Sequence, residues 1–230
     1  MKSLNAALFD LDGTLLDTPP AIAAALKSAV AEVTGENVAL QDVVQLVGRP
    51  LPILCGRLVG RHEDDPMTLA VVRAYQHRYR QDIVPSAQQL IFPGVLDGLD
   101  ALRAEGLSFA IVTSKAHHAA ESILDAAGLL DRFDVVIGAD DVKNPKPAGD
   151  AGLKALDMLS VTPEAAIVVG DTADDIRMAG AVPMRSIGVT YGSTMKEAMT
   201  ALRPTLVVED FPSAVSAIRH VMLSREEMLS

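Results

Sequence analysis

The stretch Leu8-Phe9-Asp10-Leu11-Asp12-Gly13-Thr14-Leu15 decides the fold of this chain of 230 residues. Its apolar run ends in two carboxylates spaced i, i+2, which predicts a buried strand over residues 5–9 with Asp10 at the carboxyl end. Open α/β sheets build their sites at that edge. Two carboxylates so close together indicate a bound cation, divided acid and nucleophile roles, or both.

Composition narrows the class of protein. Hydrophobic residues make up 49% and charged residues 22% of the chain, as in ordinary globular proteins. A net charge of −10 argues against a nucleic-acid partner, because phosphate backbones are bound by clustered Lys and Arg. No apolar run reaches the ~20 residues of a membrane span, and Asp10 and Asp12 interrupt any signal-peptide pattern. We therefore expect a cytoplasmic monomer or homodimer that acts on a small molecule and uses neither a membrane nor a nucleic acid.

From about residue 85 onward, short apolar runs alternate with helical segments. Strands are expected at 109–112, 135–137, 166–169, 185–189 and 206–208. Helices are expected at 95–105, 116–127, 147–159, 174–180 and 195–201. This alternation predicts right-handed crossovers and a doubly wound parallel sheet.

The segment between the first strand and the rest of the sheet has a different pattern. Ile22, Leu26 and Val30 recur at helical spacing, and further helices are expected at 40–47, 51–59 and 66–81. We interpret residues 18–85 as an α-helical insert, with hinges at Pro19-Pro20 and Pro85-Ser86. Residues 1–17 and 86–230 would then form the sheet domain.

Three polar motifs follow later strands. They are Thr113-Ser114-Lys115, Lys143-Asn144-Pro145-Lys146-Pro147 and Gly170-Asp171-Thr172-Ala173-Asp174-Asp175. Because parallel strands end at the same edge of a sheet, these motifs should meet Asp10 in one crevice. The sequence thus predicts a site that combines carboxylates, a hydroxyl group and a lysine.

These four motifs, in this order, resemble those of the haloacid dehalogenase-like hydrolase superfamily. The resemblance covers nearly the whole chain, including the position of the helical insert, which corresponds to the family's cap. Asp10 to Leu15, Phe92-Pro93-Gly94-Val95 and the motif from Gly170 most resemble phosphoglycolate-phosphatase-like enzymes. The resemblance implies a Rossmann-like doubly wound parallel sheet core with an inserted α-helical cap domain.

The first motif would then carry the covalent chemistry. Asp10 is implied to be the nucleophile that forms an aspartyl-phosphate, and Asp12 the general acid and base. Gly13 would allow a tight turn beside the phosphoryl group, and Thr14 would order the loop by hydrogen bonding.

The later motifs would bind the phosphoryl group. Thr113 is implied to donate a hydrogen bond to it, with help from the Ser114 amide. Lys146 would balance the charge of the phosphoryl oxygens and of Asp10, although Lys143 competes for this role. Thr113 could instead serve only as a helix N-cap.

The same resemblance implies a Mg²⁺ site. Asp10, the Asp12 carbonyl and Asp171 would be ligands, and Asp175 would bind directly or through water. Mg²⁺ prefers octahedral oxygen ligands and keeps several waters, which suits such a set.

Two cationic residues have open roles. Arg49 stands where similar caps place a substrate-facing basic residue, and a surface arginine is an equal alternative. Lys115 lies near the site, with substrate contact and a structural role equally supported. We include both among the candidate substrate-binding residues, together with Gly13, Thr14 and Ser114.

Asp12 distinguishes among the related chemistries. A halide needs no proton to leave, whereas an alkoxide does, so Asp12 favours hydrolysis of a phosphate monoester over dehalogenation. We expect a Mg²⁺-dependent phosphatase for a small phosphorylated metabolite, with 2-phosphoglycolate as the leading substrate. The alternatives are phosphoryl transfer like that of β-phosphoglucomutase, pyrophosphate hydrolysis, and a non-catalytic binding protein on this scaffold.

Overall fold

A six-stranded parallel sheet forms the centre of the computed structural model, which describes residues 4–44 and 46–223. The sheet order is β3-β2-β1-β4-β5-β6. The strands are β1 (Ala6–Phe9), β2 (Ser108–Val112), β3 (Val135–Ile137), β4 (Ala166–Gly170), β5 (Arg185–Val189) and β6 (Leu206–Val208). The predicted doubly wound α/β fold is confirmed, and each strand lies within about one residue of its predicted position.

Strand register brings the polar motifs to one edge. Phe9 at the end of β1 is level with Ile111 in β2 and with Val169 in β4. Asp10 extends this pairing, because its amide donates to the Val169 carbonyl at 2.9 Å. The residues that follow β1, β2 and β4 therefore lie beside one another.

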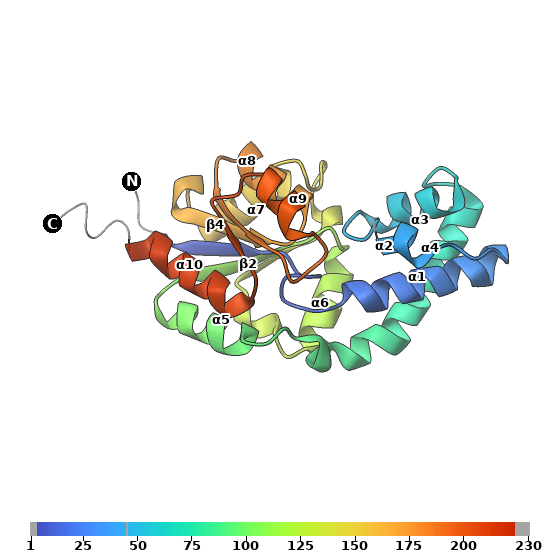
Figure 1. Cartoon of the computed structure of the whole chain (residues 1–230), viewed down its shortest axis with the longest axis horizontal. Helices are drawn as coiled ribbons and strands as arrows, with labels where there is room; N and C mark the ends of the chain where they lie inside the picture. The colour runs from blue at the N-terminus through green and yellow to red at the C-terminus, as the bar shows by residue number, and fades with distance from the viewer. Residues whose placement is uncertain (1–3, 45, 224–230) are drawn as a thin grey trace.

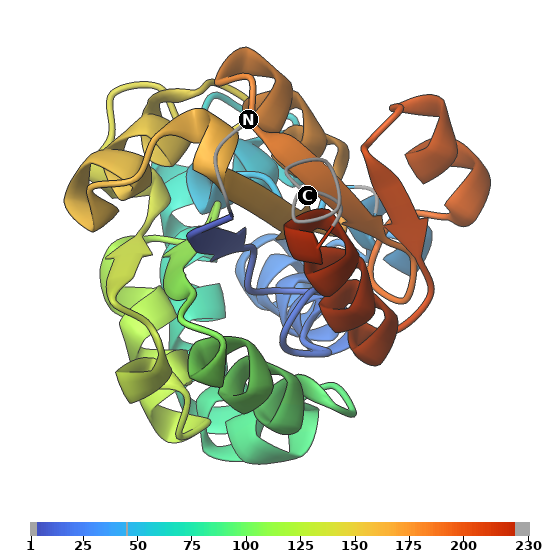
Figure 2. The same ribbon diagram turned by 90° about the vertical axis from the view of Figure 1, so that its left-hand side faces the viewer.

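Helices cover both faces of the sheet (Figures 1 and 2). Side chains alternate along β1, so that Ala7 and Phe9 join one hydrophobic core while Ala6 and Leu8 join another. The first core contains α5 (Val95–Ala104), α6 (His117–Ala126) and α10 (Phe211–Leu223), and the second contains α7 (Asp150–Leu159) and α8 (Ala173–Ala181). The short α9 (Lys196–Ala201) packs beside β5 and β6.

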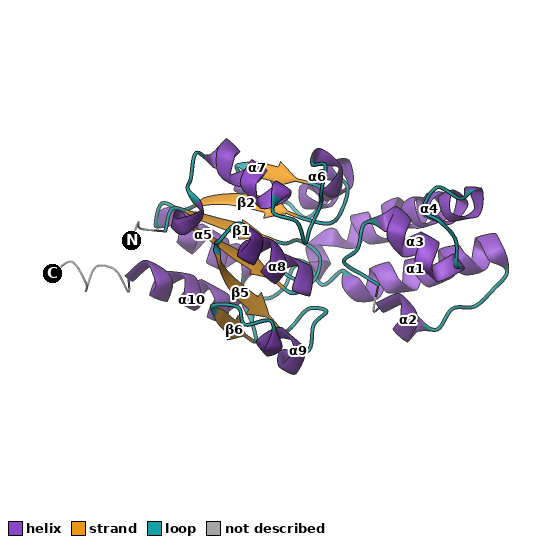
Figure 3. Ribbon diagram, turned by 90° about the horizontal axis from the view of Figure 1, so that it is seen from above, coloured by secondary structure: helices purple, strands orange, loops and turns teal. Residues whose placement is uncertain are grey.

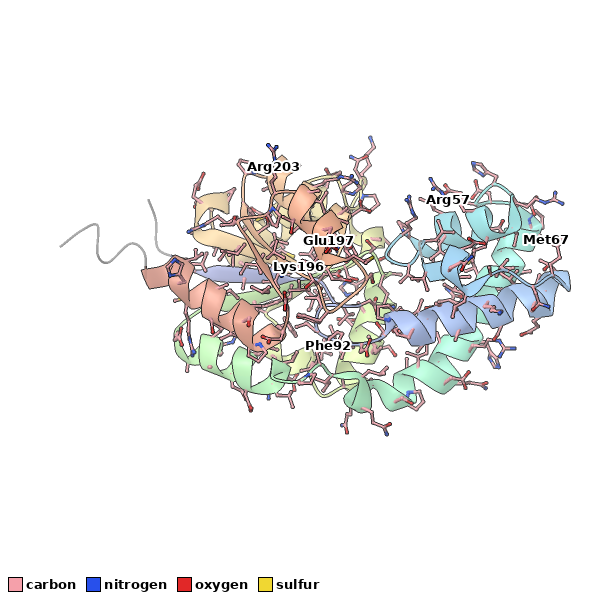
Figure 4. The ribbon with its side chains drawn as sticks, in the orientation of Figure 1. Arg57, Met67, Phe92, Lys196, Glu197 and Arg203 are labelled. Atoms are coloured by element: carbon pink, nitrogen blue, oxygen red, sulfur yellow. The ribbon has the colours of Figure 1, made fainter. Side chains whose placement is uncertain are left out.

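The regular structure in the described part of the segment between β1 and α5 is helical, apart from isolated β-bridges of Leu16 with Asp12 and Ile91, and the segment extends from the carboxyl edge of the sheet (Figure 3). Its elements are α1 (Pro19–Thr34), α2 (Leu40–Val44), α3 (Leu51–Val59), α4 (Pro66–Arg78), a π-helical turn (Tyr79–Ile83) and a 3₁₀ helix (Val84–Leu90). In Figure 4, Arg57 and Met67 lie on this segment away from the sheet, whereas Phe92 lies where the chain returns.

Several predicted boundaries shift. α7 begins at Asp150 rather than at 147, because residues 145–148 form a turn in which the Ala148 amide donates to the Pro145 carbonyl. The predicted helix over 66–81 ends at Arg78 and continues as the π-helical turn. Gln45, within the predicted helix 40–47, lies outside the described residues. Among the described helices, none is long and apolar enough to cross a membrane.

Candidate active site

A buried ion-pair network lies at the carboxyl edge of β1. The Lys146 ammonium donates to Asp10 Oδ1 at 2.7 Å, to Asp175 Oδ1 at 2.5 Å and to the Val112 carbonyl at 2.9 Å. The Lys146 side chain is only 2% exposed, so these contacts replace its water shell. The network fixes the Asp10 carboxylate against strands β1 and β2.

Asp171, the first residue after β4, is held by two loops, the one that contains the first motif and the one that follows β5. Its Oδ1 accepts a hydrogen bond from Thr14 Oγ1 at 3.2 Å, and its Oδ2 accepts one from the Ser193 amide at 2.6 Å. Gly13 has a φ of +86°, and a Cβ atom there would collide with the Asp171 carboxylate. The loop can approach Asp171 this closely only because residue 13 is glycine.

Asp175 has a second, structural contact. Thr172 and Asp175 form a capping box at the start of α8, in which Asp175 Oδ2 accepts from the Thr172 amide at 3.0 Å. The Thr172 hydroxyl also donates to this oxygen at 2.6 Å. This capping box fixes the first turn of α8 and thereby directs Oδ1 of Asp175 toward Lys146.

The carboxylates of Asp10, Asp171 and Asp175, which we call the carboxylate cluster, have ligand oxygens that all lie within 4.8 Å of one another. Among the described residues, Lys146 is the lysine that contacts this cluster, through Asp10 and Asp175, so three carboxylates share one positive charge and negative charge is in excess. Hard divalent cations take such oxygen donors, and the donor set therefore fits a metal ion.

The pKa values reflect this excess. Burial raises the pKa of Asp10 well above its usual range; Lys146 opposes the shift, while Asp175 and Asp171 add to it. Burial, followed by repulsion from Asp175, raises the pKa of Asp171 to about 6. Burial disfavours the charge on Lys146, but Asp10 and Asp175 outweigh it and raise the pKa of the ammonium group. A bound cation would relieve the same repulsion.

Asp12 lies outside the cluster and has different partners. Its Oδ1 accepts a hydrogen bond from Thr18 Oγ1 at 2.5 Å, and its Oδ2 lies 3.1 Å from Lys115 Nζ. The two aspartates of the first motif are thus held apart, with Asp10 in the network of Lys146 and Asp12 in that of Lys115.

A cavity of about 310 Å³ opens beside Asp12, between the sheet and the helical segment. We call it the cap cavity. Asp12, Ser114 and Lys115 line it from the sheet side, and Arg49 lines it from the helical segment. The loop of Arg49 also lines a smaller, polar pocket with Thr172 and the start of α8.

The structure brings most of the predicted residues to this edge. Thr113 is buried, and its hydroxyl accepts a hydrogen bond from the Lys115 amide at 3.2 Å. Between the two competing lysines, Lys146 lies in the site while Lys143 is exposed. Asp174 is directed elsewhere, to an ion pair with Arg177 at 3.6 Å.

Sequence reasoning missed several supporting residues. Thr18 is one of them, since its hydroxyl donates a hydrogen bond to Asp12. Ser193 and Tyr191 lie in a loop after β5, where the Tyr191 hydroxyl donates to the Thr14 carbonyl at 2.8 Å. Two tyrosines of the helical segment, Tyr75 and Tyr79, also line the cavity. A signal was available for the last pair, because they are spaced i, i+4 in a helical stretch.

A parallel sheet with an acidic cluster, a buried lysine and a cavity at its carboxyl edge is the arrangement in which α/β enzymes bind small molecules. The profile of the haloacid dehalogenase-like hydrolase family matches residues 7–189, and the chain belongs to this family.

Curated relatives match along almost the full length. The chain is 37% identical over 223 residues to probable phosphatase IndB of Dickeya dadantii, covering 97% of this chain and 96% of that one. It is 30% identical over 237 residues to the phosphoglycolate phosphatase of Salmonella paratyphi A, covering 95% and 94% of the two chains.

Solved structures share the fold. A predicted phosphoglycolate phosphatase from Haemophilus somnus superposes with a TM-score of 0.83 at 22% identity, covering 94% of this chain and 99% of that one. The β-phosphoglucomutase of Clostridium difficile gives the same TM-score, 0.83, at 20% identity, covering 99% and 100%. These two matches bear on the fold alone.

Proposed function

We propose that this protein is a Mg²⁺-dependent phosphatase that hydrolyses a small phosphate monoester through an aspartyl-phosphate on Asp10. One observation carries the proposal: Asp10 and Asp12 are two residues apart, yet each is held by its own lysine. This separation supports two roles, since Asp10 faces the carboxylate cluster and Asp12 faces the cap cavity. The names of the full-length relatives support phosphate ester chemistry.

In the first step, a carboxylate oxygen of Asp10 attacks phosphorus, and the bond between phosphorus and the ester oxygen breaks. Asp12 donates its proton to the departing alkoxide, which leaves as the alcohol. Lys146 holds Asp10 Oδ1 at 2.7 Å and so keeps the carboxylate in one orientation. The product is the aspartyl-phosphate.

In the second step, Asp12 takes a proton from a water molecule whose oxygen attacks the same phosphorus. The bond between phosphorus and Asp10 breaks, which releases inorganic phosphate and restores both aspartates. Thr18 supports both steps by holding Asp12 Oδ1 at 2.5 Å. Thr113, the Ser114 amide and Lys146 would bind the phosphoryl oxygens.

Asp10, Asp171 and the Asp12 carbonyl would hold Mg²⁺, which when bound supplies charge neutralisation to the phosphoryl group. Both oxygens of Asp175 already accept hydrogen bonds, from Lys146 and Thr172. We therefore assign Asp175 a water-mediated contact with the ion. The residues of this chain supply positioning, which phosphoryl transfer chiefly requires.

We assign residues 18–85 to a cap domain that covers the site, and residues 1–17 and 86–230 to the catalytic core. Pro19 begins α1, and Pro85 lies within the 3₁₀ helix that follows the π-helical turn. Arg49 and Lys115 would face the alcohol part of the substrate from opposite sides of the cavity. Relatives named phosphoglycolate phosphatase make 2-phosphoglycolate the first compound to test.

The variant Asp10→Asn tests the nucleophile. We expect hydrolysis of p-nitrophenyl phosphate with Mg²⁺ to fall by about 10⁴-fold or more, because the amide cannot form the acyl phosphate. A circular dichroism spectrum and melting curve would establish that the fold persists. Substantial residual activity in a folded variant would refute the mechanism, and complete inactivity of the wild-type protein on a panel of phosphorylated metabolites would refute the function.

The variant Asp12→Asn tests the acid and base. We expect kcat for an alkyl phosphate to fall by about 10²- to 10⁴-fold. The first step with p-nitrophenyl phosphate should suffer far less, because p-nitrophenolate leaves without a proton. The size of the burst of p-nitrophenol in rapid mixing separates the two steps. Equal losses in the first step for both esters would exclude Asp12 as the acid.

A further inference from the structure

The cap cavity is placed where the alcohol part of an ester would lie. Asp12, the residue assigned to protonate the leaving oxygen, lines the cavity, whereas Asp10 does not. The phosphoryl group would therefore lie at the carboxylate cluster and the alcohol would extend past Asp12 into the cavity. The chemical character of its walls then bears on the class of substrate.

Apolar side chains form most of the walls on the cap side. Ile22 and Leu26 come from α1 and Leu54 from α3, and all three are buried. Tyr75 and Tyr79 add two aromatic rings whose centroids are 5.8 Å apart at an interplanar angle of 40°. These five side chains come from α1, α3, α4 and the π-helical turn and make this side of the cavity mainly apolar.

Charged groups are confined to the sheet side and the rim. Lys115 is already committed, because its Nζ lies 3.1 Å from Asp12 Oδ2 and 4.4 Å from the centroid of the Tyr79 ring. Arg49 and Arg80 are exposed residues at the cavity's edge. An alcohol that reaches the interior would thus meet one ion pair at its base and mainly apolar side chains on the cap side, among which the Tyr79 hydroxyl is a buried polar group without a hydrogen-bond partner in the described part of the chain.

The size of the cavity also bears on the alcohol. A volume of about 310 Å³ corresponds to roughly ten water-sized groups at ~30 Å³ each. Glycolate would fill about half of that space, and among the lysines and arginines described at the cavity its carboxylate would find only Lys115, already paired with Asp12, and the exposed arginines at the rim. A ring attached to the ester carbon would occupy more of the volume than glycolate does and would bury its own apolar surface.

We propose that the preferred substrate is a phosphate monoester of a primary alcohol that carries an aromatic or other apolar ring, and that the cap cavity holds this ring. The proposal rests on the phosphatase function proposed above and narrows its substrate class. It ranks such esters above 2-phosphoglycolate.

A matched pair of esters tests the proposal. Ethyl phosphate and 2-phenylethyl phosphate release primary alkoxides of similar basicity, so they differ mainly in the ring. We expect kcat/KM to be about 10- to 100-fold higher for 2-phenylethyl phosphate, the ratio that burial of one phenyl ring supplies. It should also exceed the value for 2-phosphoglycolate. Equal values for the matched pair, or a higher value for 2-phosphoglycolate, would overturn the proposal.

A cavity-filling variant shows where the ring binds. Ala119 on α6 lines the cavity, so Ala119→Phe should place a ring in the space and reduce the preference for 2-phenylethyl phosphate to about 2-fold or less. The exposed Ala198 on α9 does not line it, and Ala198→Phe is the matched control, with the preference retained. A preference that survives in folded Ala119→Phe would place the ring elsewhere and overturn the assignment.

The failures of the two proposals are distinguishable. Hydrolysis of p-nitrophenyl phosphate without any preference for the ring would leave the phosphatase function standing and reject the substrate class. Hydrolysis of none of the four esters in the presence of Mg²⁺ would reject the function and the substrate class together.

Discussion

The carboxylate cluster and the cap cavity lie next to each other, yet they are built in opposite ways. In the cluster, Asp10 and Asp175 are tied to Lys146 by contacts of 2.7 and 2.5 Å, and Asp171 is held by the Ser193 amide at 2.6 Å. Apolar surfaces dominate the cap side of the cavity, where contacts have no preferred direction. Under the proposed function, fixed geometry would serve the reaction, whereas volume and apolar area would serve the choice of substrate.

Replacement of Lys146, the counter-ion of Asp10 and Asp175, should have the largest effect on activity and stability. We expect Lys146→Met to lower the activity by about 10³-fold and the free energy of unfolding at pH 7.5 by about 3–5 kcal/mol, because buried carboxylates lose their counter-ion. Without that counter-ion the pKa of Asp10 rises further, so the loss should shrink as the pH falls and the acid is protonated.

Urea unfolding at pH 7.5 and pH 5 measures this effect. Lys154→Met is a suitable control, since Lys154 is a partly exposed lysine on α7 whose nearest carboxylate oxygen is 3.5 Å away. The electrostatic explanation would be wrong if Lys146→Met lost the same stability at both pH values.

The metal affinity of the cluster should depend steeply on pH. Asp171 has a pKa of about 6 without metal, so protons compete with the cation below pH 6. We expect Mg²⁺ affinity to weaken by about 10-fold or more between pH 7 and pH 5, as measured by calorimetry or by the Mg²⁺-dependent shift in Tm. The raised pKa also means that the metal-free protein loses stability as the pH rises from about 4 to 6. A pH-independent affinity would contradict the role of Asp171.

Loss of the Thr18 hydroxyl should have a smaller, selective effect at the border between the two regions. Thr18→Val keeps the volume but removes the 2.5 Å hydrogen bond to Asp12. We expect kcat for ethyl phosphate to fall by about 10-fold, with little change in the p-nitrophenol burst, because only the alkoxide needs the proton. Thr34→Val, which removes a hydroxyl bonded to the Val30 carbonyl on the same helix, should change neither rate.

Much of the site could be predicted because its residues follow buried strands. Asp10, Thr113 and Asp171 stand at strand ends, and parallel topology alone brings such positions together. Thr18 and Ser193 could not be found in this way, since loop conformation decides their contacts with Asp12 and Asp171. The walls of the cavity were equally hidden, because helix packing decides which apolar residues surround a space.

The helix α10 was missed although the sequence carries its signal. Phe211, Ala214, Val215 and Ile218 follow helical spacing, and all four are buried against the sheet side. Conversely, the prediction of a helix from 147 extended too far, because the chain must first turn to bring Lys146 into the site. Periodicity identifies where a helix lies more reliably than where it begins.

The smallest effect on turnover is expected at Gly48, in the loop of the helical segment that lies beside Thr172 at the start of α8. Gly48 and Gly35 both have positive φ, +96° and +74°, but only at Gly48 would a Cβ meet a neighbour, the Thr172 methyl group at 3.4 Å. We expect Gly48→Ala and Gly35→Ala to lose about 1–2 kcal/mol of stability each. Only Gly48→Ala should also lower kcat/KM, by about 2- to 3-fold. Equal kinetics for the two variants would show that this approach is irrelevant to turnover.

The register of β1 with β4 has a consequence for the design of new enzymes on this scaffold. The spacing between Asp10 and Asp171 follows from main-chain hydrogen bonds such as Asp10 N to Val169 O at 2.9 Å, which no exchange of cavity side chains alters. Libraries that randomise Ile22, Leu26 and Leu54 would therefore explore new substrates while the reactive centre stays intact. The backbone pairing of β1 with β4 thus sets the distance between the two carboxylates, and the side chains of the cavity walls can be varied without changing it.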